Sequence, residues 1–387
     1  MFGSDSVNLP LLKQRAFNLR WASVPEGVIP LTAADPDFPC AEPIRDAIHA
    51  FTKDGYFSYG DALGYAPFKQ ALANNYANVK HTCFHPSNIL PVDSAAYGIY
   101  LICKSFLNAG DEAIIFDPVD FLFRYSIETV GAVAIPFAIP AGTAQVDFSK
   151  MEQLITPKTK MICLCNPLNP TGKVFSKEEL ISLGNIAIKY NLLILSDEIW
   201  SDIIFKPAVF TSMASLDEDI RQRTITVTGF SKSYGLAGLR IGAIMTTNDA
   251  HFNTIYQASL HQSTVHGSNI LGQVAATAAL NACGDWLKQF ITHLQKMRDI
   301  TVSSLNEING VHCIAPDGCY VAFANITGTG MSSEAIQKQL LENAKVAVVP
   351  GLKQWFGEGA EGYIRLCFAT SEEILCEALS RINKTLK

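Results

Sequence analysis

Six short apolar runs recur along this 387-residue chain, and most are separated by helical patterns or by segments of crossover length. The runs span residues 112–116, 132–137, 160–165, 192–196, 223–228 and 241–246. Strands that alternate with helices in this way form a largely parallel sheet. The pattern therefore predicts an α/β fold, in which a ligand binds at the carboxyl ends of the strands.

The character of the chain changes after residue 248, where long helical patterns replace the alternation. The later elements are a helix over 286–308, short strands over 319–323, 346–349 and 363–368, and a final helix over 371–385. We therefore expect a smaller α+β domain joined by a long helix, which a chain of this length can accommodate. The predicted division is a large domain over 45–285 and a small domain over 1–44 and 286–387.

A lysine stands in an unusual place at the start of the turn 231–242. Lys232 follows an apolar strand-like run and precedes three glycines, so it lies where a strand edge meets a ligand. Arg240 adds a second cation, and the hydroxyls of Ser231 and Ser233 add donors. A desolvated lysine can lose its proton and form a Schiff base. Together these groups suit a phosphate with an aldehyde beside it; the alternative is a basic loop on a helical surface.

Other polar segments also stand at predicted strand ends. Ser94, Ala95 and Ala96 precede a predicted helix, so their backbone N–H groups are free to bind an anion. The segment 166–172, which is rich in asparagine and proline, follows one apolar run, and Asp197 ends another. Taken alone, Asp197 is equally a helix cap or a metal ligand.

Composition and charge exclude several classes of function. The net charge of −6 argues against nucleic acid as a partner. Residues 1–20 lack the apolar segment of a signal peptide, and prolines and glycines break the long uncharged stretch 129–146, so we expect a cytoplasmic protein without a membrane span. The histidines and cysteine within 81–85 lack a fourth ligand, so we expect no metal site.

These segments, in their order and spacing, resemble one family. From about Leu31 to its C-terminus the chain is similar to fold-type I pyridoxal-phosphate enzymes of the class I and II aminotransferase family. The matching motifs are Pro36-Asp37-Phe38-Pro39, Tyr59 with Gly64, Asn166-Pro167-Leu168-Asn169-Pro170-Thr171-Gly172, Asp197-Glu198-Ile199, Ser231-Lys232 with Arg240, and Ile364-Arg365. The resemblance implies a three-layer large domain around a mostly parallel seven-stranded sheet, a smaller α+β domain, and a homodimer with shared active sites.

The resemblance also implies pyridoxal 5'-phosphate as the cofactor and assigns its chemistry to two residues. Lys232 would hold the cofactor as an internal aldimine and then act as general acid and base. Asp197 would face the pyridine nitrogen and keep it protonated, so that the ring withdraws electrons from the substrate. The implied reaction moves an amino group between an amino acid and a 2-oxo acid.

Further matching residues are implied to bind cofactor or substrate. Asn169 would hydrogen-bond the ring oxygen and also contact the substrate. Arg365 would hold the substrate α-carboxylate with a two-point fork, beside Ala34. Tyr59, counted among the catalytic residues, would reach the phosphate bound by the neighbouring subunit. The implied phosphate ligands within one subunit are Ser94, Ala95, Ala96, Ser231 and Arg240.

The chain departs from the family pattern at several positions beside the cofactor. Asp120 stands where relatives place an aromatic ring over the cofactor, and Phe121 or Phe123 would have to replace that ring. Trp200 replaces a tyrosine and keeps only an N–H donor. Ala34 replaces a glycine. We still expect Asp120 and Trp200 beside the cofactor, where Asp120 would favour a substrate with a cationic or hydroxyl group.

The same scaffold supports several reactions, so particular residues must choose between them. The cystathionine β-lyase-like branch tends to have histidines where this chain has Leu168 and Trp200, and its lysine motif differs from the one around Lys232. An aminotransferase is therefore favoured. The segment 33–35 resembles the lyase branch and keeps a carbon–sulfur β-lyase as the alternative. A cofactor-binding regulator is a third interpretation, disfavoured because only about thirty residues precede the match, too few for a DNA-binding domain.

Overall fold

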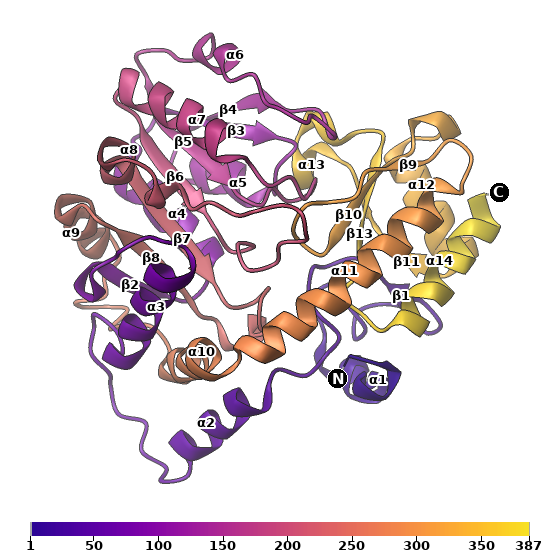
Figure 1. Ribbon diagram of the computed structural model, residues 1–387, viewed down its shortest axis with the longest axis horizontal. Helices are drawn as coiled ribbons and strands as arrows, with labels where there is room; N and C mark the ends of the chain where they lie inside the picture. Colours follow the sequence, from indigo (N-terminus) through magenta and orange to yellow (C-terminus); the bar gives the residue numbers. More distant parts are fainter. Residues whose placement is uncertain (1, 387) are drawn as a thin grey trace.

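A seven-stranded sheet forms the centre of the larger part of the molecule, as the computed structural model shows for residues 2–386 (Figure 1). The model confirms the predicted α/β class with a mostly parallel sheet of seven strands. In spatial order the strands are β2 (Ile89–Val92), β8 (Gly242–Thr246), β7 (Thr224–Gly229), β6 (Leu193–Asp197), β5 (Thr159–Cys165), β3 (Glu112–Asp117) and β4 (Val133–Ala138).

Only β8 runs against its neighbours among these strands, because it pairs antiparallel with both β2 and β7. The six predicted runs all form strands, and β2 is the one that the apolar pattern missed. It is four residues long and contains Pro91, which cannot donate to a ladder. Proline belongs at a sheet edge, and β2 is an edge strand.

Helices cover both faces of this sheet. The connections from β2 to β3 and from β3 to β4 progress along the sheet in one direction, whereas those from β5 to β6 and from β6 to β7 progress in the other. Right-handed crossovers therefore place α4 (Ala95–Phe106) and α5 (Leu122–Thr129) on one face, and α7 (Lys177–Lys189) and α8 (Glu218–Arg223) on the opposite face. The remaining helices of this part are α2 (Glu42–Thr52), α3 (Ala66–Val79), α6 (Ser149–Glu152), α9 (Asp249–Ala258) and α10 (Ile270–Ala282).

A smaller α+β unit contains the C-terminal elements. Its antiparallel sheet has the order β12 (Val349–Pro350), β13 (Tyr363–Cys367), β10 (Val321–Asn325) and β9 (His312–Cys313). The predicted strand 346–349 is split, because β11 (Val346–Ala347) pairs instead with the N-terminal β1 (Ile29–Pro30). The helices of this part are α1 (Leu9–Arg15), α11 (Gly284–Asn306), α12 (Ser333–Gln339), α13 (Lys353–Phe356) and α14 (Glu372–Leu386).

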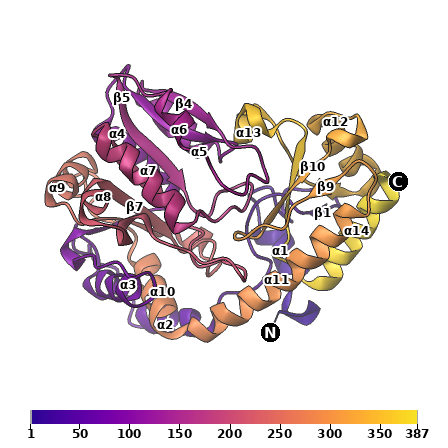
Figure 2. The same ribbon diagram turned by 45° about the horizontal axis from the view of Figure 1, so that its top comes forward.

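Two features join the units. The long helix α11 extends from beside α10 to the small unit, where it lies next to α14 (Figure 2). At the other side of the molecule, the segment that follows β3 is tied to α13, because the backbone N–H groups of Val119 and Phe121 donate to the carbonyls of Phe356 and Trp355 at 2.8 and 2.9 Å. These bonds hold the carboxyl end of β3 against the small unit.

The exact division at residues 45 and 285 stays a prediction. In the described range 2–386, no helix is both long enough and apolar enough to span a bilayer.

Candidate active site

A cavity of about 600 Å³ opens at the carboxyl ends of the parallel strands, between the two units. Twelve of the predicted site residues line it, although they come from segments far apart in the chain. They are Ala34, Ser94, Ala95, Ala96, Asp120, Asn169, Asp197, Trp200, Ser231, Lys232, Arg240 and Arg365. Two further residues expected at the site, Tyr59 and Ser233, are not among the residues that line it.

Lys232 projects into this cavity from the turn after β7. Its Nζ donates to the carbonyl oxygen of Ala34 at 2.8 Å and lies 5.3 Å from the centre of the Trp200 ring. Burial lowers the pKa of the Lys232 amine, and the neighbouring carboxylates of Asp35 and Asp120 only partly oppose that effect. The amine is therefore easier to deprotonate than an exposed lysine, as a nucleophile requires.

Asp197 is the last residue of β6 and is buried, with 6% of its surface exposed. Its Oδ1 accepts a hydrogen bond from the backbone N–H of Ile199 at 3.1 Å. Burial raises the pKa of Asp197 to about 7, and the nearby carboxylates of Asp120 and Glu198 add to the increase. Such a carboxyl needs a cationic or proton-donating partner to ionise fully, and the cavity is where that partner would bind.

Asp120, Asn169 and Arg365 form one chain of hydrogen bonds along the cavity wall. Asn169 Nδ2 donates to Asp120 Oδ2 at 2.8 Å, and Asn169 Oδ1 accepts from Arg365 Nη1 at 3.1 Å. The other oxygen of Asp120 accepts from the backbone N–H of Leu122 at 3.2 Å. Burial raises the pKa of Asp120, and the positive charge of Arg365 opposes this. The two ends of the chain therefore fix the orientation of the Asn169 amide.

Arg365 lies on β13 and is buried. Its Nη2 donates to the carbonyl of Thr32 at 3.1 Å, and its guanidinium lies 5.1 Å from the centre of the Phe356 ring. Its Nε is buried without a hydrogen-bond partner among the described residues. A buried unpaired donor on a cation is costly unless a ligand satisfies it, so the arrangement fits a small carboxylate.

The N-terminus of α4 forms another part of the wall. Ser94 caps the helix by accepting from the backbone N–H of Tyr97 at 3.0 Å, which leaves the N–H groups of Ala95 and Ala96 without a carbonyl one turn earlier. A Cβ at Gly242 would lie only 2.7 Å from the Ala95 nitrogen, so only glycine lets β8 approach this helix so closely. A helix N-terminus of this kind binds anions such as phosphate.

Residues 26–382 match a single protein family, described as aminotransferase class I and II. The chain belongs to this aminotransferase family. It is 33% identical over 370 residues to a putative aminotransferase, YugH, of Bacillus subtilis, covering 94% of this chain and 93% of that protein. It is 32% identical to an aspartate aminotransferase of Pyrococcus horikoshii, covering 95% and 92% of the two chains. A pyridoxal-phosphate-bound putative aminotransferase of Clostridium difficile superposes with a TM-score of 0.90 at 25% identity, covering 97% and 98% of the two chains.

The enzyme is therefore an aminotransferase, as the sequence motifs predicted, and its family implies pyridoxal phosphate as the cofactor. The groups lining the cavity fit that molecule. They supply an amine for its aldehyde, a carboxyl with a raised pKa for its ring nitrogen, and an anion site at a helix N-terminus for its phosphate. Arg240 also lines the cavity, in the left-handed conformation with φ of 49°.

One predicted detail of the aminotransferase site differs in the structure, and one agrees with it in part. Ser233, expected to add a donor beside Lys232, is fully buried and donates to Asp202 at 2.7 Å, away from the cavity. Trp200 does line the cavity, yet it packs edge-on against Tyr320 with 4.6 Å between ring centres. Its position is set by the apolar cluster of the small unit as much as by the site.

Tyr59 lies outside the cavity in a single chain. Its side chain is 88% exposed, on the same loop as the exposed Tyr56 and Phe57. Its ring meets His266 edge-on at 4.8 Å, so it belongs to a separate surface hollow. The structure of one subunit therefore leaves its predicted catalytic role as a proposal.

Several residues that shape the site were not predicted from the sequence. Asp37, recognised only as part of a motif, accepts from Arg20 at 2.5 Å and from the Trp21 indole at 2.8 Å, and this buried cluster holds the loop that carries Ala34. The hydroxyl of Tyr320 donates to the same Ala34 carbonyl that binds Lys232, at 3.2 Å. The pairing of a buried arginine with a motif aspartate has no local sequence signal, because the partners are 17 residues apart in an irregular segment.

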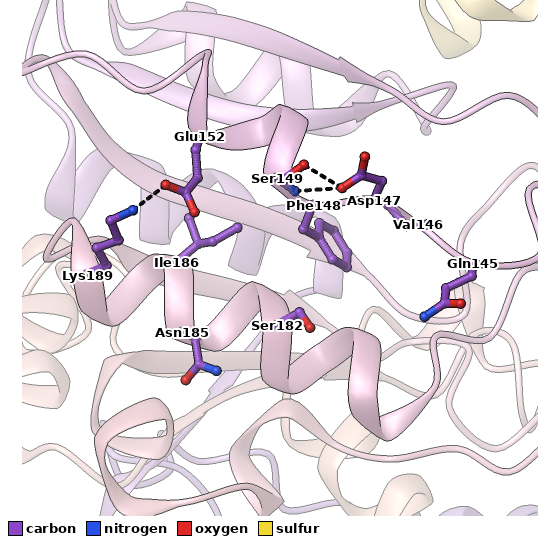
Figure 3. Close-up of a pocket in the computed structure, with 10 residues that line it drawn as sticks. All are labelled: Gln145, Val146, Asp147, Phe148, Ser149, Glu152, Ser182, Asn185, Ile186 and Lys189. Atoms are coloured by element: carbon purple, nitrogen blue, oxygen red, sulfur yellow. Dashed lines mark hydrogen bonds and ion pairs between the residues drawn. The ribbon is translucent and has the colours of Figure 1, made fainter.

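A second hollow, of about 590 Å³, lies on the large unit between residues 145–152 and α7 (Figure 3). Its charged side chains already have partners among the residues of the hollow. Lys189 pairs with Glu152 at 2.5 Å, and Asp147 accepts from both the hydroxyl and the backbone N–H of Ser149. The hollow therefore offers a ligand little beyond surface contact, and the chemistry belongs to the cavity around Lys232.

Proposed function

We propose that this aminotransferase moves an amino group between an amino acid and a 2-oxo acid by using Lys232 as the residue that binds the cofactor. One observation carries the proposal. Among the described residues, a single cavity contains a half-buried amine with a lowered pKa, a buried carboxyl with a raised pKa, an arginine with an unpaired Nε, and a helix N-terminus. When bound, pyridoxal phosphate supplies an electron-withdrawing ring that makes the α-proton of the amino acid acidic.

The residues divide the remaining work. Lys232 donates the amine that holds the cofactor, and once released it removes and returns the proton at the substrate α-carbon. Asp197 would stabilise a proton on the ring nitrogen, since burial disfavours its negative charge unless a positive charge lies opposite. Trp200, on the next turn, lines the same wall, and its ring centre lies 5.3 Å from Lys232 Nζ.

Cofactor and substrate are positioned by the groups at the rim of the cavity. The α4 N-terminus at Ser94, Ala95 and Ala96, together with Ser231 and Arg240, binds the phosphate. Asn169 donates its second N–H to the ring oxygen, because the first is held by Asp120. Arg365 binds the substrate α-carboxylate with Nε and Nη2, and Ala34 contacts the substrate opposite. These assignments follow the donors that line the cavity.

We place the enzyme in the cytoplasm as a homodimer in which the loop of Tyr59 completes the site of the partner. The support is the exposure of three aromatic rings on one loop, Tyr56, Phe57 and Tyr59, since clustered exposed aromatics mark protein interfaces. A dimer of this kind would bury them and bring the Tyr59 hydroxyl to a phosphate.

The reaction is tested by incubating the purified enzyme with amino acids, with and without 2-oxoglutarate or pyruvate. Amino transfer that depends on the 2-oxo acid supports the proposal. Release of pyruvate and ammonia from cystathionine without an acceptor would instead support the β-lyase alternative. Only amino transfer requires the 2-oxo acid, so the two reactions can be distinguished even if a contaminating enzyme acts on one of the substrates.

The role of Lys232 is tested by borohydride reduction followed by peptide mapping. In the wild-type enzyme the reduced cofactor should be attached to Lys232 alone. The Lys232→Ala variant should carry no adduct and should lose amino transfer by at least about 10³-fold. Lys80 is the control residue in the peptide map. It is buried but forms an ion pair with Asp202 at 3.1 Å, so it should carry no adduct. An adduct that persists on another lysine of the variant would refute the assignment.

A further inference from the structure

The cations that line the cavity are few, and the proposed function uses every one of them. Within the described residues they are Lys232, Arg240 and Arg365. The first binds the cofactor aldehyde, the second its phosphate and the third the substrate α-carboxylate. Asp120 and Asp197 place two carboxyls on the same walls. A second carboxylate on the substrate would therefore meet no free positive charge, and it would be repelled by Asp120.

Asp120 itself is already committed to the protein. Its Oδ1 accepts from the backbone N–H of Leu122 and its Oδ2 from Asn169. A carboxylate with both oxygens bonded gains less from an additional substrate cation than a free one would. These bonds favour a role for Asp120 in orienting Asn169. They do not favour the role suggested by the sequence, which is recognition of a cationic substrate side chain.

The wall beside Arg365 is apolar and aromatic. The Phe356 ring lies against the Arg365 guanidinium, and Val349 is the cross-strand neighbour of Arg365 on β12, so both stand next to the point where an α-carboxylate binds. The Phe121 ring packs edge-on against Trp355 at 5.7 Å. The wall thus continues outward from Arg365 through three aromatic rings.

This wall is preformed. The two backbone bonds from Val119 and Phe121 to α13 fix the segments that carry the rings on both sides. Phe121 nevertheless remains 38% exposed, and Leu19, which also lines the cavity, is 47% exposed. Rigid apolar groups that line a concavity and stay partly exposed are the surface that a ligand covers on binding.

In the proposed dimer, the loop of Tyr59 and the loop that it contacts would not add the missing cation to the site of the partner. The loop 55–64 contains tyrosines, phenylalanine and one aspartate, and the loop 259–269 contains two histidines, and neither has a lysine or arginine. These loops meet at Tyr59 and His266. In the proposed dimer they would extend the aromatic surface of the site.

We propose that the amino donor of this enzyme is an amino acid with an aromatic or large apolar side chain, seated against Phe121, Trp355 and Phe356, and that dicarboxylic amino acids are poor donors. The proposal rests on the proposed function, because it requires Arg365 to take the α-carboxylate. It names the substrate class that the cavity selects.

The test measures binding and reaction separately in the cofactor-loaded enzyme. Calorimetry compares 3-phenylpropanoate with succinate, which are unreactive acids with one and two carboxylates. We expect 3-phenylpropanoate to bind at least about tenfold more tightly, as a filled apolar pocket distinguishes ligands by such factors. The half-reaction, followed by the change in cofactor absorbance without any acceptor, should favour L-phenylalanine over L-aspartate by a similar factor.

Variants locate the effect on the aromatic wall. Trp355→Ala should reduce the ratio of the two binding constants by at least about fivefold. Phe121→Leu, a milder change, should reduce it in the same direction and covers the case in which Trp355→Ala does not fold. Tyr125→Ala removes an exposed aromatic on the outer side of α5 and should leave the ratio unchanged.

A ratio below tenfold in the wild-type enzyme, or one that favours succinate and L-aspartate, overturns the substrate class while amino transfer itself stands. A ratio that Trp355→Ala and Phe121→Leu both leave unchanged also overturns it, because the wall would then not contact the substrate. Absence of any half-reaction with both amino acids, together with absence of an adduct on Lys232, would instead refute the proposed function.

Discussion

Asp197 should destabilise the cofactor-free protein and stabilise the loaded enzyme, so a single substitution should have opposite effects on the two forms. In the absence of the cofactor its carboxyl is buried, and the resulting pKa of about 7 compares with an ordinary value of 3.8. At about 1.4 kcal/mol per pH unit, ionising this group in the folded protein costs about 4 kcal/mol more than in the unfolded chain. Asp197→Asn removes that cost.

The sign of the effect follows from proton linkage. Because the folded pKa is raised, the folded state binds its proton more tightly, and the free energy of unfolding falls as pH rises from about 4 to about 7. Wild type and Asp197→Asn should thus be similarly stable near pH 4. Above about pH 7 the cofactor-free variant should be more stable by at most about 4 kcal/mol. Asparagine retains an oxygen for the Ile199 N–H, so little of this gain should be lost to a missing hydrogen bond.

The assay is urea unfolding, followed by circular dichroism, of both proteins with and without cofactor at about pH 4 and pH 8, at one protomer concentration. With pyridoxal phosphate bound the order should reverse at pH 8, since the variant cannot ionise opposite the ring nitrogen and binds the cofactor more weakly. Cofactor-free Asp197→Asn that is no more stable than wild type at pH 8 would refute the reasoning about burial. A cofactor affinity equal to that of wild type would refute the contact with the ring.

Two further substitutions test the walls of the cavity. Arg365→Lys keeps the charge but loses the planar guanidinium that donates to Asn169 and to the Thr32 carbonyl, so KM for the amino acid should rise about 10- to 100-fold with a smaller change in kcat. Arg381→Lys on the surface should change neither value in steady-state kinetics. An unchanged KM in Arg365→Lys would contradict the assigned α-carboxylate site. Gly242→Ala would place a Cβ 2.7 Å from the Ala95 nitrogen, so it should lower the free energy of unfolding by about 1–3 kcal/mol and weaken cofactor binding. Urea unfolding and equilibrium dialysis measure the two effects. Gly238→Ala, with open space around its Cβ, is the control, and equal behaviour of the two variants would contradict the close approach of β8 to α4.

Residues at strand ends were predictable because each strand of the sheet corresponds to a local pattern in the sequence. Apolar runs give the strands, their order along the chain gives parallel pairing, and parallel pairing collects the residues after each strand at one edge. Asp197 and Lys232 both follow this logic, and both line the cavity. Ser233 shows where the logic fails, since one residue further along a tight turn points a hydroxyl to Asp202 instead of the ligand.

The aromatic wall was not predictable from the sequence. Trp355 and Phe356 belong to a four-residue helix whose local pattern resembles any surface turn. They face the cavity because backbone bonds dock this helix on the segment after β3, more than 230 residues earlier in the chain. The same is true of Leu19, whose place depends on the hydrogen bond that its carbonyl accepts from the Thr32 hydroxyl. Contacts of this kind have no periodicity to read.

Asp120 was noticed in the sequence, but its contacts are seen only in the structure. In the sequence, Asp120 departs from the family pattern, because it places a charge where relatives have an aromatic ring. This suggested that Asp120 recognises a cationic or hydroxyl group of the substrate. In the structure its backbone N–H donates to the Asn169 carbonyl and its carboxylate accepts from the Asn169 amide, so it binds one residue at two points. Asn169 in turn contacts Arg365. In the proposed site, Asp120 orients Asn169, and the substrate side chain is left to contact Phe121, Trp355 and Phe356. We therefore base the proposed substrate class on these three rings and not on the charge of Asp120.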